Sequence, residues 1–128
     1  MTTAGQQVSR PGIRATAIPG LLVVDLEVHG DSRGWFKENW QRAKMVQAGL
    51  PDFGPVQHSV AYNGARGVTR GVHAEPWDKF VSVVHGRAFG AWVDLREGLT
   101  FGVVHTETLD EGTAVFVPRG LRNSYQVL

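Results

Sequence analysis

The sequence predicts an all-β domain, and a double-sheet jelly roll is the architecture that matches it best. Short runs of β-branched and aliphatic residues are separated by turn-forming residues at intervals of about 8–12, as in sandwiches and barrels. Sixteen glycines and six prolines are scattered along the 128 residues, which indicates many short elements joined by tight turns. A chain of this length forms one domain with a single core.

The expected elements follow from these runs. A first strand runs from Leu21 to His29 and ends at Gly30 and Asp31, and a second covers 34–39. The segment 40–49 is the only helical candidate, with Asn39 as the expected N-cap and Gly49 as the stop. Further strands are expected at 56–62, 68–73, 79–85, 88–95, 101–109, 113–118 and 123–128.

Composition excludes several classes of function. The net charge of +1 gives no basic field of the kind that nucleic-acid binding needs. No apolar run approaches the roughly 18 residues of a membrane span, so we expect neither nucleic acid nor membrane as a partner. Residues 1–12 are polar and read as a loose tail without the hydrophobic core of a signal peptide. The absence of cysteine excludes disulfides and is consistent with a cytoplasmic protein.

The strongest candidate for chemistry is the run from Arg70 to His73, with Lys79 six residues further on. Histidine has an unperturbed pKa near neutrality, so it can take up or release a proton under ordinary conditions. A nearby lysine strengthens this interpretation, because each group makes the protonation state of the other useful. Strand alternation places Arg70 and His73 on opposite faces, but a bulge at Gly71 would turn Arg70 toward the same cavity. A strand-end histidine bonded to a nearby carbonyl is an equally good interpretation of His73 alone. A lone Lys79 is usually just solvated.

A second constellation runs from Asp31 to Glu38. The guanidinium of Arg33 suits a phosphate group, and Phe36 and Glu38 share one face of the strand. The simpler alternative is a solvated turn with Phe36 in the core. Further along, Asp94 and Arg96 are expected to form a structural ion pair at a strand end.

The sequence predicts no metal site. Clustered histidines would indicate one, but His73 is followed by Glu75 rather than by a second histidine. No glycine-rich phosphate loop or dinucleotide fingerprint is present either.

Several separated motifs together resemble the dTDP-4-dehydrorhamnose 3,5-epimerase family of cupin-fold sugar-nucleotide enzymes, from about Ile18 to Leu128. These are Asp31-x-Arg33-Gly34-x-Phe36-x-Glu38, Gln57, Gly67-Val68-x-Arg70-Gly71-x-His73, Lys79, Val93-Asp94-Leu95-Arg96-x-Gly98, Thr100-Phe101-Gly102 and Pro118-x-Gly120-Leu121. The stretch from His73 to Phe80 is especially similar to epimerase-like domains fused to a reductase in some actinobacteria.

The resemblance implies a cupin-type double-stranded jelly roll with one short helix, spanning 18–128. Residues 1–17 would be a flexible tail or a segment exchanged with a partner. The protein would be a homodimer with N-terminal strands added to the partner's sheet, acting on a nucleotide-linked 4-keto-6-deoxyhexose without metal or organic cofactor. A fused or associated reductase is a further expected partner.

The resemblance also implies a role for each site residue. His73 matches the general base that removes a proton beside the ketone, and Lys79 matches the cation that stabilises the enolate oxygen. The expected substrate-binding residues are Arg33 and Arg70 for the diphosphate, with Phe36, Glu38, Gln57 and Asn123.

The sequence departs from the family pattern at three places. His58 and Ser59 follow Gln57 where the family has Gln-x-Asn, and Asn123 replaces a histidine. The family's acid tyrosine and the acidic partner of its base lie on segments beyond the equivalent of Leu128, and Tyr125 matches a core aromatic instead. Two other functions therefore stay open. One is a sugar 3,4-ketoisomerase of the same fold, although such enzymes usually have histidine where Glu75 stands. The other is a cupin domain that binds its ligand without turnover.

Overall fold

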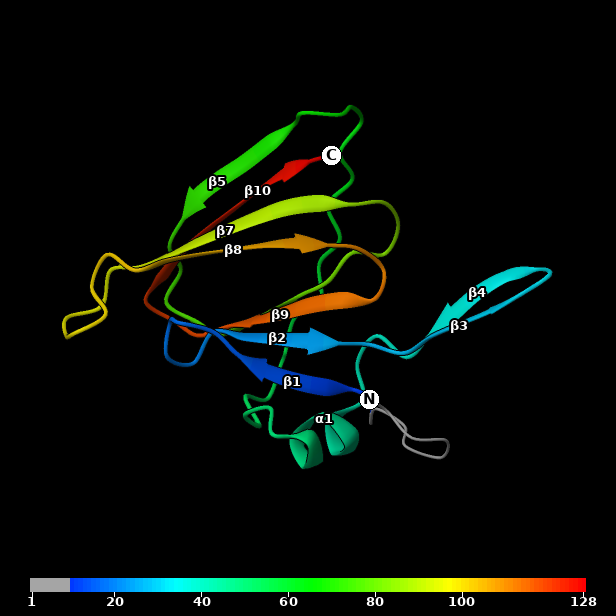
Figure 1. Cartoon of the computed structure of the whole chain (residues 1–128), viewed down its shortest axis with the longest axis horizontal. Helices are drawn as coiled ribbons and strands as arrows, with labels where there is room; N and C mark the ends of the chain where they lie inside the picture. Colours follow the sequence, from blue (N-terminus) through cyan, green and yellow to red (C-terminus); the bar gives the residue numbers. More distant parts are fainter. Residues whose placement is uncertain (1–9) are drawn as a thin grey trace, which may run out of the picture.

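Two four-stranded antiparallel sheets form the body of the molecule (Figure 1). The computed structural model describes residues 10–128. The first sheet has the order β1 (Gly12–Ala15), β2 (Leu22–Asp25), β9 (Thr113–Val117) and β6 (Lys79–Val81). The second has the order β5 (Thr69–His73), β10 (Leu121–Val127), β7 (Ala88–Asp94) and β8 (Val104–Leu109). The predicted all-β double-sheet architecture is confirmed.

The remaining elements are a hairpin and one helix. Strands β3 (Val28–Asp31) and β4 (Gly34–Lys37) pair only with each other and project from one end of the body (Figure 1). The helix α1 (Arg42–Ala48) lies next to the first sheet, and its buried Met45 packs against that sheet's outer face. This is the single short helix that the sequence predicts.

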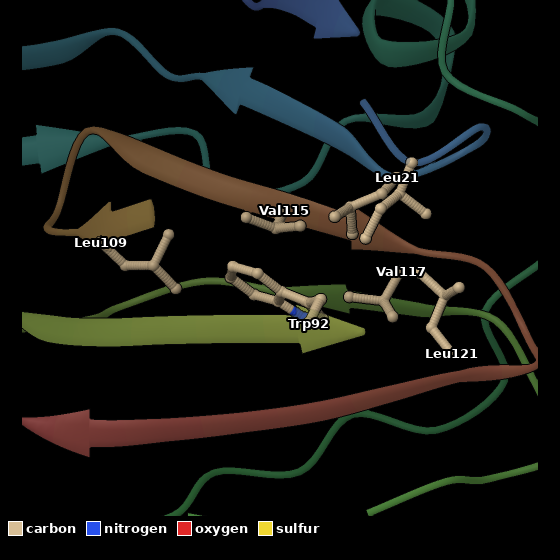
Figure 2. Packing of buried hydrophobic residues seen from close by; sticks show 7 residues of the cluster. Leu21, Trp92, Leu109, Val115, Val117 and Leu121 are labelled. Carbon is tan, nitrogen blue, oxygen red and sulfur yellow. The ribbon is translucent and has the colours of Figure 1, made fainter. Parts of the chain in front are cut away.

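The main core lies between the two sheets (Figure 2). Trp92 of β7 and Leu121 of β10 pack against Val115 and Val117 of β9, and all four are at most 3% exposed. Because side chains alternate along a strand, Ala114 and Phe116 point to the other side of β9. There they form a second cluster with Met45. The inner face of the first sheet is therefore the face that carries Val115, and the inner face of the second sheet is the face that carries Trp92.

The helix begins two residues later than predicted. Gln41 is the N-cap, and its side chain accepts a hydrogen bond from the Lys44 backbone N–H at 2.8 Å. Asn39 does not cap the helix because Trp40 packs edge-on against Phe53 and Phe80 and holds the intervening chain extended. The predicted stop at Gly49 is confirmed.

Other expected elements also differ from the structure. The strand expected at 21–29 divides at Leu26, whose N–H donates to Gly112, so that β2 joins a sheet and β3 joins the hairpin. The segment 56–62 is not a strand, because none of the described strands pairs with it and its apolar side chains are exposed. Within the expected N-terminal tail, Gly12–Ala15 pair with β2 of the same chain, supported by an ion pair between Arg14 and Asp25. Residues 1–9 lie outside the described residues.

The predicted ion pair between Asp94 and Arg96 is confirmed and anchors the β7–β8 connection. Asp94 is 1% exposed, and its carboxylate accepts from the Arg96 guanidinium at 3.0 and 3.1 Å and from Thr100 Oγ1 at 2.7 Å. The Arg96 guanidinium holds the pKa of the Asp94 carboxyl well below its usual range. This stabilisation is complete above the unfolded-state pKa near 4 and is lost as pH falls below it.

We expect Asp94→Ala to lower the free energy of unfolding by about 3 kcal/mol, because it leaves the donors of Arg96 and Thr100 without their acceptor. Urea unfolding at pH 7 measures this change. The matched control is Asp52→Ala, which removes an exposed ion pair with Arg42 and should change stability little. Equal effects of the two substitutions would contradict a special role for the Asp94 network.

Candidate active site

A β-bulge brings Arg70 and His73 onto the same face of the second sheet. His73 pairs with Asn123, and Arg70 pairs with Tyr125, so two residues of β5 stand opposite the single residue Ser124 of β10. The extra residue shifts the alternation by one position. Arg70 and His73, three apart in sequence, therefore lie on one face together with Asn123 and Tyr125. The bulge that the sequence indicated at Gly71 is confirmed.

This shared face is the inner face of the sheet. Asn123 and Tyr125 lie two and four residues after Leu121 on β10, so all three point to the same face. Leu121 is 2% exposed and belongs to the core between the sheets. Asn123 also pairs with the buried Trp92 of β7. His73 itself is exposed, because β5 is the edge strand of its sheet. The imidazole thus stands at the open margin of the inner face, where a ligand can reach it.

Lys79 faces the same space from the other sheet. It pairs with Val117, and its neighbour Val81 pairs with Val115, so the side chains of Lys79 and Val81 lie on the inner face of the first sheet. The ammonium contacts the carboxylate of Glu75, four residues earlier in the chain. Burial lowers the pKa of Lys79, which eases the loss or sharing of its proton.

Arg70 is held by residues that the sequence did not single out. Its Nε donates to Asn63 Oδ1 at 2.7 Å, and its Nη2 donates to the Tyr62 carbonyl at 3.3 Å. The Asn63 amide in turn donates to the Tyr125 hydroxyl at 3.2 Å. Asn63 precedes Gly64 and therefore reads as an ordinary turn residue in the sequence. No local pattern pointed to its contact with Arg70.

Asn123 is linked to the backbone of His73, and this is not the imidazole–carbonyl bond of the alternative interpretation. The Asn123 Nδ2 donates to the His73 carbonyl oxygen at 3.1 Å. That bond uses the backbone of His73 and leaves its imidazole free of this contact. Asn123 therefore fixes the end of β5 beside the inner face, while its amide oxygen lies next to the same space.

Other candidate site residues, Arg33, Phe36 and Glu38, come from the hairpin and the residue that follows it, apart from His73. Figure 1 shows the hairpin projecting from the end of the body opposite to the C-terminal end of β5. Arg33 is 88% exposed in its side chain and pairs with Asp31 at 2.6 Å, while Phe36 is 67% exposed. Glu38 pairs with Lys44 of the helix at 2.9 Å. The alternative interpretation that places Phe36 in the core is wrong, because this side chain is exposed.

Gln57 lies in the exposed segment 56–62, and its side-chain amide donates to Ser59 Oγ at 3.1 Å. Within residues 10–128 no three His, Asp or Glu side chains gather as metal ligands do. The only helix described there has seven residues and is far too short to cross a bilayer.

A family model described as dTDP-4-dehydrorhamnose 3,5-epimerase matches residues 15–128. The chain belongs to this family. A relative from Streptococcus pyogenes, described as a protein RmlC homolog, is 52% identical over 116 residues and is matched over 58% of its length by 87% of this chain. The dTDP-4-dehydrorhamnose 3,5-epimerase of Pseudomonas aeruginosa is 36% identical, with 88% of this chain and 65% of that protein covered.

A solved structure of RmlC from Streptococcus suis, in complex with dTDP-D-xylose, superposes on this epimerase-family chain with a TM-score of 0.87. The two are 49% identical, and the match covers 91% of this chain and 63% of the other. The predicted cupin-type jelly roll is therefore confirmed. The chain spans about three fifths of the length of these three relatives.

Proposed function

We propose that this chain takes part in the epimerisation of a nucleotide-linked 4-keto-6-deoxyhexose. The observation that carries the proposal is the bulge in β5, which sets His73 and Arg70 on one inner face while Lys79 faces them from the other sheet. Membership of the epimerase family and the dTDP-sugar bound by the Streptococcus suis relative support the same substrate class.

The chemistry follows from the acidity of C–H bonds beside a ketone. A neutral His73 imidazole removes the proton from the carbon next to the C4 carbonyl, and the electron pair moves onto the carbonyl oxygen. The ammonium of Lys79 stabilises the resulting enolate, and burial, which lowers the pKa of Lys79, suits a group that shares its proton with that oxygen. A proton taken from solvent and added to the other face of the carbon inverts its configuration, and the enolate electron pair returns to that carbon. Arg70 and Asn123 contact the substrate from the same inner face.

The hairpin completes the site from a second copy of the chain. Arg33 and Phe36 belong to the β3–β4 hairpin, which projects from the end of the body opposite to the C-terminal end of β5, and Trp35 and Phe36 expose aromatic surface on it. In a homodimer this hairpin reaches the partner's open inner face and supplies a cation for the diphosphate and a ring for the base. Gln57, in the exposed segment 56–62, lines the nucleotide end of the same site.

Two further features of the proposal rest on composition and resemblance. A cytoplasmic location is consistent with a chain that has no cysteine. A fused or associated reductase, which would use the epimerised ketone, stays a prediction. Glu75 contacts Lys79 where ketoisomerases of this fold usually have histidine, and this favours the epimerase over the ketoisomerase.

Incubation with dTDP-4-keto-6-deoxyglucose in heavy water tests the proposal. We expect deuterium at C3 and C5, followed by NMR or mass spectrometry, because each deprotonated carbon takes its new proton from solvent. Exchange at C3 alone would indicate the ketoisomerase or an epimerase acting on one carbon. Binding without exchange would contradict the proposal and leave a binding domain.

We expect Arg33→Ala to weaken dTDP binding by about 10- to 100-fold, since a guanidinium–phosphate contact contributes about 1.5–3 kcal/mol. Isothermal titration calorimetry measures the dissociation constant. Thermal stability should hardly change, because Arg33 contacts Asp31 at the exposed hairpin tip. Arg42→Ala, which removes another exposed arginine, is the control. Equal dissociation constants for wild type and Arg33→Ala would refute the phosphate role.

A further inference from the structure

Lys37 ends the hairpin at the point where β4 returns to the body. Its ammonium donates to the carbonyl oxygen of Val83 at 2.6 Å and to that of Glu111 at 2.9 Å. These acceptors lie in two separate turns of the body, one after β6 and one between β8 and β9. One side chain therefore links the hairpin to two segments that are 46 and 74 residues away in the sequence.

The other strand of the hairpin has its own anchor. Leu26, two residues before β3, donates its backbone N–H to the Gly112 carbonyl at 2.9 Å. This bond lies in the same β8–β9 turn as Glu111. Both chain segments that connect the hairpin to the body are thus attached to it. A backbone hydrogen bond holds the segment before β3, and the Lys37 ammonium holds the end of β4. Two attachment points fix the direction of the hairpin relative to the sheets, whereas a single attachment point would let the hairpin rotate about it.

The surroundings of Lys37 fit a structural cation. The side chain is half-buried, and the indole ring of Trp35 lies 5.9 Å from the ammonium. Burial lowers the pKa of Lys37, while the charges of Glu111 and Asp110 act in the opposite direction. A partly buried ammonium needs acceptors in place of water, and the two carbonyls supply them. An apolar side chain of similar length would leave both carbonyls without this donor.

We infer that Lys37 is a positioning residue that sets the direction of the hairpin and, through it, the affinity for the nucleotide. The inference rests on the proposed function, in which Arg33 and Phe36 of the hairpin contact the nucleotide-sugar. Lys37 touches neither the reacting atoms nor the phosphates in this arrangement. It acts by holding the strand that carries the groups which do.

Spin labels test the direction of the hairpin independently of catalysis. The chain has no cysteine, so Ser32→Cys at the hairpin tip and Thr108→Cys on β8 give one labelled pair per chain. Labelled protein diluted with unlabelled protein restricts the measurement to distances within one protomer. In double electron–electron resonance we expect a narrow distance distribution with Lys37 and a broad one with Lys37→Met. Arg42→Met, which removes an exposed cation of the helix, should keep the narrow distribution.

The same variants are titrated with dTDP. We expect Lys37→Met to raise the dissociation constant about tenfold, because the binding groups are misplaced rather than removed. An unchanged distance distribution in Lys37→Met overturns the inference. A broadened distance distribution with an unchanged dissociation constant would support the anchoring role of Lys37, but it would refute the part of the hairpin in the proposed site. If Lys37→Met does not fold, Lys37→Gln serves the same test, because its shorter neutral amide cannot span both carbonyls.

Discussion

His73→Ala should abolish deuterium incorporation into a dTDP-4-keto-6-deoxyhexose, at C3 and at C5 alike. The loss of a positioned general base lowers a rate by about 10²- to 10⁴-fold, which brings exchange close to the background in heavy water. The fold should not suffer, because His73 is exposed on an edge strand and its bond with Asn123 uses the backbone carbonyl, which alanine keeps. We expect the free energy of unfolding to stay within about 0.5 kcal/mol of wild type.

His85→Ala is the matched control for this experiment. Its imidazole is 90% exposed in a turn and lies 3.5 Å from Glu111, away from the inner face of the sheets. Exchange at the wild-type rate is expected for this variant. Persistent exchange in His73→Ala, with NMR showing an intact fold, would mean that another group removes the proton. Loss of dTDP binding in His73→Ala would instead indicate a binding role for the imidazole.

The predictable part of the fold is the part that alternation and turn residues determine locally. The strand from Thr113 to Val117 and the helix stop at Gly49 follow directly from such patterns. The segment 56–62 has the same strand-like composition, yet it stays unpaired and exposed, because pairing depends on a neighbouring strand that the local pattern cannot reveal. Likewise, nothing in the run from Leu21 to His29 shows that its two halves join different sheets.

The candidate site also has a part that the sequence predicts and a part that it does not. The glycine between Arg70 and His73 was enough to suggest a bulge, and the register of β5 against β10 bears this out. Asn63 was missed because its contact with Arg70 spans an irregular loop that leaves no periodic signal. The projection of the hairpin was also beyond the sequence, since the anchor at Lys37 joins segments more than forty residues apart. The chemical roles of these residues stay predictions for the variants above.

Gly71→Ala should damage both stability and catalysis, because the bulge leaves no room for a side chain. Gly71 has a φ of 115°, and a Cβ built there would lie 2.7 Å from both the Asn123 carbonyl oxygen and Ser124 Cβ. Either β5 moves away from β10 or the bulge is lost, and both changes separate His73 from Arg70. We expect the free energy of unfolding to fall by about 2–3 kcal/mol and deuterium exchange to fall to background.

Gly49→Ala separates the backbone cost of a positive φ from the cost of the collision with β10. Gly49 has the same φ of 115° at the end of the helix, but a Cβ there meets nothing within 4 Å. It therefore carries the backbone cost of an L-residue without the collision with β10, and we expect a smaller loss of stability and normal exchange. If Gly71→Ala were to keep the wild-type exchange rate in the folded protein, the bulge would not be what brings the base and the guanidinium together. The proposed reaction would then need another geometric basis, because regular alternation leaves Arg70 and His73 on opposite faces of the sheet.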